Sequence, residues 1–159
     1  MNTTIKEIEI RQRLSELNLN LTEGLTFLPE EIETISSSDD LVFADSLTQI
    51  RKLFKANNVE FTTLGAEASK FRARKTADIY LPGLFISVGL LSDNPAAISV
   101  ALSVLANYVT DFFKGTVGSK KASLDIYVEK TDKKIVTKIS YTGDSEGIKN
   151  LEGIIKELK

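Results

Sequence analysis

The feature that most constrains this fold is an apolar stretch in the middle of the chain. Residues 96–113 carry one charged side chain, Asp111, and an apolar run at residues 84–91 precedes them. The intervening Ser92-Asp93-Asn94-Pro95 offers capping side chains and a proline suited to a first helical turn. The sequence therefore predicts a long helix from Pro95 to Phe113 that is apolar on most of its sides.

The predicted helix also has a narrow polar ridge. Its members recur at intervals of four residues and so lie on one side of the helix: Ser99, Ser103, Asn107 and Asp111. Apolar side chains cover most of the remaining surface, and five of them are candidate interaction residues: Ile98, Leu102, Leu105, Val109 and Phe112.

Three interpretations of this stretch stay open at the level of sequence. The helix can be the centre of the domain's own core, which is the usual place for an apolar run of this length. It can instead pack against a second copy or another protein, because a large exposed apolar face marks an interaction surface. Thirdly, residues 84–113 can act on a membrane, although eighteen residues is a short span and both Asn107 and Asp111 lie inside it.

Composition excludes several classes of catalysis. The chain has no histidine and no cysteine. Histidine is the usual base near neutral pH and a common zinc ligand, and a thiolate needs cysteine. Any enzymatic activity would have to use carboxylates or lysine. We expect instead a non-enzymatic protein with no cofactor and no metal. The absence of cysteine and the charged residues at 6–13 favour a reducing, cytoplasmic location.

Periodicity outlines the secondary structure on either side of the apolar stretch. Residues 4–17 and a segment after Pro29 are predicted as helices, and a further helix follows Asp45 and Ser46 with Gln49 completing a capping box. Residues 59–64 and 77–81 read as short strands.

The C-terminal third has the clearest pattern. Apolar residues alternate on both sides of the turn at 131–134, which predicts a β-hairpin from Leu124 to Tyr141 with one buried face. An apolar stripe with helical spacing then runs from Ile148 to Leu158. Asp144 or Ser145 is expected to cap this last helix, which should pack on the hairpin.

These elements predict an α+β fold within a single domain, residues 1–159. It has N-terminal helices, a small antiparallel sheet with a C-terminal β-hairpin plus helix, and one long buried apolar helix. Residues 114–121 hold two glycines and three lysines. They are the best candidate for a sub-boundary between the helical, apolar part and the ββα tail.

Two charged clusters are candidate sites. The densest basic cluster lies at residues 70–75, where Lys70, Arg72, Arg74 and Lys75 surround one phenylalanine, a mixture that suits anion or nucleic-acid contact. The formal net charge of −2 gives no long-range attraction for a polyanion. The acidic residues Asp39, Asp40 and Asp45 match no calcium-loop spacing, and a solvated surface explains them better.

The leading functional hypothesis is a non-enzymatic interaction or accessory subunit. It would associate with itself, as a homo-oligomer, or bind a larger protein partner through the apolar stretch and the edge of the hairpin. The first alternative is a nucleotide or nucleic-acid binding module that uses loop 70–75. The second is a membrane-active effector that uses segment 84–113.

Overall fold

The computed structural model describes residues 2–38, 41–65, 70–73, 78–115, 120–131 and 135–158. In this part of the chain the fold is mixed α+β, as the sequence predicts. The helices are α1 (Arg11–Glu16), α2 (Leu47–Ala56), α3 (Val88–Asp93), α4 (Pro95–Phe112) and α5 (Ser145–Glu157). The strands are β1 (Asn2–Ile8), β2 (Leu25–Leu28), β3 (Phe43–Ala44), β4 (Thr62–Thr63), β5 (Phe71–Arg72), β6 (Ile79–Tyr80), β7 (Gly83–Ile86), β8 (Ala122–Glu129) and β9 (Val136–Gly143).

Most of the described strands belong to one mixed sheet, larger than the small antiparallel sheet that was expected. Its order is β1-β9-β8-β7-β2-β4, and β6 pairs with β8 beside β7. The predicted hairpin is confirmed as β8 and β9, which pair antiparallel from Ala122–Gly143 to Glu129–Val136. β7 and β8 are parallel, so the chain must cross over between them, and α3 and α4 make this connection.

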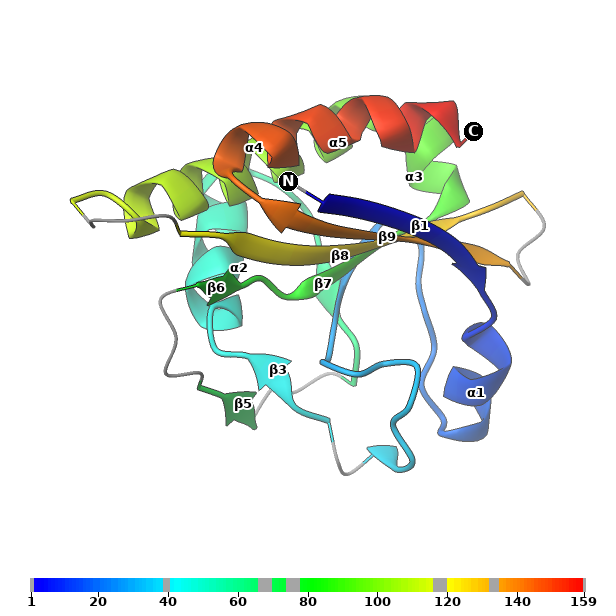
Figure 1. Cartoon of the computed structure of the whole chain (residues 1–159). Helices are drawn as coiled ribbons and strands as arrows, with labels where there is room; N and C mark the ends of the chain where they lie inside the picture. Colours follow the sequence, from blue (N-terminus) through cyan, green and yellow to red (C-terminus); the bar gives the residue numbers. More distant parts are fainter. Residues whose placement is uncertain are drawn as a thin grey trace.

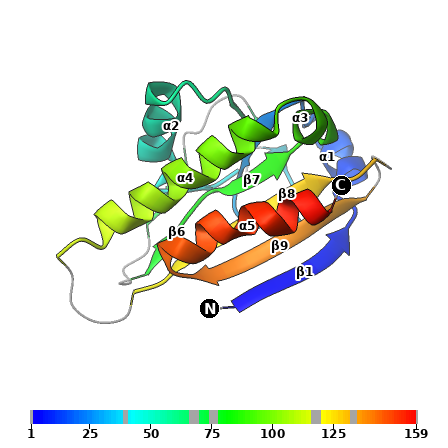
Figure 2. The same cartoon turned by 90° about the horizontal axis from the view of Figure 1, so that it is seen from above.

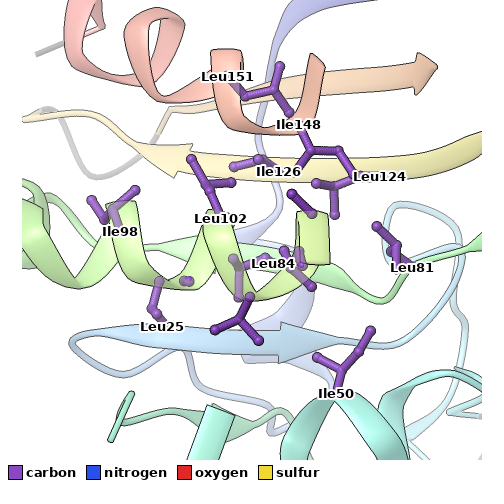
Figure 3. Close-up of a cluster of buried hydrophobic side chains, with 14 of the residues drawn as sticks. Leu25, Ile50, Leu81, Leu84, Ile98, Leu102, Leu124, Ile126, Ile148 and Leu151 are labelled. Carbon is purple, nitrogen blue, oxygen red and sulfur yellow. The ribbon is translucent and has the colours of Figure 1, made fainter. Parts of the chain in front are cut away.

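Helices and irregular segments cover the two faces of the sheet (Figures 1 and 2). Helices α3, α4 and α5 lie on one face, with α4 and α5 side by side, while α1 lies on the opposite side. The larger hydrophobic cluster joins α4 and α5 to the sheet, and Figure 3 shows Leu102, Ile126 and Leu151 meeting there. A second cluster on the other face includes Leu14 and Tyr127.

The N-terminal prediction was partly wrong. Residues 2–8 form a strand, and α1 begins only at Arg11. Every residue of β1 pairs with β9, from Asn2–Thr142 to Ile8–Val136, and this ladder outweighs the weak helical spacing. The short helix expected after Pro29 is a turn instead, because Glu31 adopts a left-handed conformation (φ 55°) that ends any helix there.

Two capping predictions had different outcomes. Asp144 caps α5, since its carboxylate accepts a hydrogen bond from the Gly147 backbone N–H at 2.9 Å. The capping box at α2 is wrong: Ser46 makes no side-chain cap bond and donates its hydroxyl to the carbonyl of Tyr80 at 2.9 Å. Its side chain links α2 to β6.

A buried ion pair holds α1, β8 and α3 together. Glu129, the last residue of β8, is 1% exposed and accepts hydrogen bonds from the Arg11 guanidinium and from the backbone N–H of Val88. The guanidinium carbon of Arg11 also lies 5.7 Å from the centre of the Phe85 ring. The carboxylate is therefore neutralised by a cation and by the first N–H of α3.

Candidate functional site

The five apolar candidates on α4 occupy two environments. Ile98, Leu102, Leu105 and Val109 are at most 2% exposed and belong to the chain's own core, so they offer no surface in this structure. Phe112 is 52% exposed at the end of the helix, beside Tyr108. The helix is therefore a core element, because the sheet and α5 cover the side on which these aliphatic residues lie.

The rest of the apolar segment is divided between two kinds of structure. Residues 83–86 form β7 inside the sheet, paired with β2 and β8, and α3 follows. Helix α4 is long and apolar enough, by length and composition alone, to be compatible with crossing a membrane.

The polar ridge of α4 includes a contact between helices, in which the Ser99 hydroxyl donates a hydrogen bond to the Glu152 carboxylate of α5.

The basic cluster is only partly described. Arg74 and Lys75 lie outside the described residues, and Lys70 is exposed next to β5. Arg72 lies in β5, where its guanidinium is 3.6 Å from the carboxylate of Glu30 and 3.7 Å from that of Glu31. These carboxylates offset the positive charge of Arg72 that an anion would need.

The acidic candidates also fail to form a site in the described part of the chain. Asp39 and Asp40 lie outside it, and Asp45 is exposed before α2. Among the described residues no group of three or more acidic side chains has an arrangement that could hold a metal ion.

Among the helices and strands that the structure describes, β1 is the most exposed. It is the last strand at one end of the sheet, and Figure 2 shows it beyond β9 with no element on its outer side. Six of its seven residues are exposed, and Ile5 at its midpoint is 50% exposed. The edge of the hairpin that was expected to bind a partner is not accessible, because β1 covers β9 and β7 covers β8.

The side chains of β1 alternate between the two faces of the sheet. Ile5 pairs with Ile139, a member of the core cluster beneath α4 and α5, so Ile5 points to the helical face. Lys6 pairs with Lys138 and points to the opposite face, where its ammonium lies 3.2 Å from Glu33. An exposed isoleucine is thus placed on one face, and a lysine that shares the Glu33 carboxylate with Lys138 on the other.

Glu33 fastens β1 to the body of the protein. Its carboxylate accepts a hydrogen bond from Lys138 of β9 and also contacts Lys6 of β1. Burial alone would raise the pKa of Glu33, but the hydrogen bonds and positive charges of the two lysines outweigh it, so the pKa is lowered. At the C-terminal end of β1, Glu7 pairs with Lys130 at 2.5 Å. Side-chain ion pairs on both faces of the sheet therefore hold the C-terminal half of β1 in place.

An open cleft of about 990 Å³ lies between α2 and the start of α4. Its lining includes Arg51 and Lys55 of α2, Phe61 before β4, and Asn94 before α4. The guanidinium carbon of Arg51 lies 5.9 Å from the centre of the Phe61 ring. Within the described residues neither Arg51 nor Lys55 forms an ion pair, and sequence reasoning missed both because they are spaced as ordinary surface residues of a helix.

Comparison with family models, curated proteins and solved structures gives no match for this chain. The outer edge of β1 and the cleft beside Arg51 are the surfaces from which a function is argued below.

Proposed function

We propose that this chain is a non-enzymatic interaction subunit that binds an extended protein segment along the outer edge of β1. The observation that supports this is the exposure of β1: a seven-residue edge strand with six exposed residues, firmly paired on its inner side. The outer side of such a strand presents backbone N–H and C=O groups that another strand can pair with.

The opposite edge of the sheet is much less suited to this role. It is formed by β4, which has only two residues. Its Thr62 hydroxyl lies 3.0 Å from that of Thr26 and 3.2 Å from that of Thr22, so neighbouring side chains crowd the strand. Short edge strands are a common means of preventing unwanted pairing, whereas β1 is long enough for a full ladder.

The proposal is tested with peptides selected for binding from a random extended-peptide library displayed against the whole chain. Binding should slow amide hydrogen exchange in residues 2–8 and leave exchange in α4 unchanged, because a new ladder protects only the paired edge. The measurement is exchange followed by NMR, with and without a selected peptide.

Two matched variants make this test specific. Ile5→Lys places a charge at the midpoint of β1 and should weaken peptide binding at least fivefold. Val100→Lys changes another exposed apolar residue, which is 40% exposed on α4, and should leave binding unchanged. Binders that protect other segments, or that tolerate Ile5→Lys, would contradict the proposal.

A second candidate function is the binding of a small anion in the cleft. It is favoured by Arg51 and Lys55, which form no ion pair with any residue that the structure describes and lie next to the Phe61 ring. The carboxylates of Glu23 and Glu60 line the same cleft, so the anion would have to bind at its α2 side. Inorganic phosphate and ATP serve as probes in an NMR titration. The double variant Arg51→Gln, Lys55→Gln should abolish the shift changes, while Arg72→Gln, whose charge Glu30 and Glu31 already offset, should not.

A further inference from the structure

We propose that the segment bound by β1 is the β1 strand of a second copy, paired antiparallel about a two-fold axis through Ile5. This inference rests on the proposed function of β1 and specifies its partner. It is argued from the symmetry of an edge-to-edge contact, the position of Ile5 and the charges along the strand.

Symmetry limits the registers that two β1 strands can adopt. Two identical antiparallel edge strands are related by an axis normal to the sheet, so each residue keeps its face in both copies. Residues directly opposite one another share a face, and faces alternate along a strand. The axis must therefore pass through a residue facing itself, and a one-residue slip would break the symmetry.

Three such registers have their axis near the middle of β1, at Thr4, Ile5 or Lys6. They differ in the number of residues that pair and in the side chains that face each other. An axis at Lys6 pairs only residues 4–8. It also places two lysines directly opposite each other, which is destabilising because their charges are alike. An axis at Thr4 pairs only residues 2–6. An axis at Ile5 pairs the whole strand, because Ile5 is the midpoint of Asn2–Ile8.

The Ile5-centred register also agrees with the side chains. It brings together two isoleucines that are half exposed in the single chain, on the helical face of the joined sheet. Lys6 then faces Thr4 of the second copy, and Glu7 faces Thr3. The two Lys6 side chains are diagonal neighbours, and each is already paired with its own Glu33 at 3.2 Å. No directly opposed pair has like charges.

The resulting dimer would have a continuous sheet with the α4 and α5 helices of both copies on the same face. A contact made by one strand from each copy is smaller than the roughly 1,200 Å² buried by stable interfaces. The association is therefore expected to be weak and reversible, with dimer forming between about 10 µM and 1 mM protein.

Light scattering and sedimentation over this concentration range provide the test. The mass-average molar mass should rise from 17.5 kDa toward twice that value. Ile5→Lys should remain monomeric, because it places lysines opposite each other at the axis, whereas Ile5→Val should still associate. Val100→Lys is the matched control and should associate like the unmodified chain. Circular dichroism confirms that each variant is folded.

The lack of native cysteine allows the register to be tested directly. A short bifunctional maleimide should link Ile5→Cys chains into dimers, and it should link a mixture of Thr3→Cys and Glu7→Cys chains more efficiently than Thr3→Cys alone. Val100→Cys should remain largely unlinked. Equal linking of Thr3→Cys with itself would contradict the register centred on Ile5.

The outcomes separate this inference from the function on which it rests. A chain that stays monomeric at 1 mM but still binds selected peptides along β1 overturns self-pairing and leaves the proposed function supported. A dimer that is insensitive to Ile5→Lys overturns self-pairing through β1. If, in addition, no peptide protects residues 2–8, the proposed function fails as well.

Discussion

At the scale of single residues, Glu129 links three elements of the fold. Its carboxylate is buried and satisfied by the Arg11 guanidinium and the Val88 N–H, two groups that are far from it in sequence. A buried charge that loses its partner is costly, because the surroundings cannot replace the lost hydration. The side chain of Arg11 is one-third exposed, which moderates that cost.

We predict that Arg11→Met lowers the free energy of unfolding by about 3 kcal/mol, the lower end of the range for breaking a buried pair. Urea denaturation at pH 7 measures this loss. Arg13→Met is the control in the same helix: Arg13 is exposed and donates to the carbonyl of Ile35, so its loss should cost about 1 kcal/mol. Equal losses of stability in the two variants would mean that the Arg11–Glu129 pair contributes no more than an exposed hydrogen bond.

Glu33 makes stability depend on pH. Its pKa is lowered in the folded protein, so it contributes stability above its ordinary value of 4.5, and this contribution is lost as the pH falls through the lowered pKa. Glu33→Gln should therefore be less stable than the native chain at pH 6, by about 1 kcal/mol or less for a pair of this exposure. The difference should disappear in strong acid, as measured by urea denaturation at several pH values.

At the scale of elements, α4 illustrates how an apolar helix can belong to the core and still leave part of its surface exposed. Leu102 is 1% exposed between the sheet and α5, whereas Val100 lies on the outer side. We predict that Leu102→Ala costs about 2–5 kcal/mol, through lost transfer energy and a cavity. Val100→Ala should cost about 0.5 kcal/mol or less. Thermal and urea unfolding of both variants decide whether the helix is buried as described.

This placement also changes how the interaction hypothesis should be tested on α4. Charged substitutions at Leu102 or Leu105 would put an unpaired charge into the core and unfold the protein, so they cannot report on a surface. Substitutions at Ile5 and Val100, which are exposed, can test instead whether a surface binds a partner. The element that presents an accessible edge is β1.

At the scale of the whole molecule, one core cluster extends from β2 to α5. Phe27, Leu102, Ile126 and Leu151 all belong to it, although residues 114–121 separate the first two from the last two in sequence. We predict a single unfolding transition, because neither part keeps a complete core without the other. Far-UV circular dichroism and tyrosine fluorescence should give superimposable urea curves. Separate midpoints would favour a sub-boundary at 114–121.

The sequence alone determined the elements whose local pattern agrees with their final environment. The hairpin, α4 and α5 were predictable because apolar residues recur with a regular period along the sequences of β8, β9 and α5, and because Pro95 and Asp144 mark helix starts. The second half of β8 is nevertheless buried on both faces. Strands β2 and β7 were harder to recognise, since β2 is buried on both faces and β7 nearly so, and neither has a clear alternating pattern.

Only the tertiary structure decided which surfaces remain available. The strand β1 owes its structure to pairing with β9, a partner more than 120 residues away, and its exposure follows from lying at the end of the sheet. The proximity of Arg72 to Glu30 and Glu31 and the burial of Leu102 likewise depend on long-range packing. Residue type and local period determine what a segment can form, whereas its neighbours in space determine which of its groups stay free to bind.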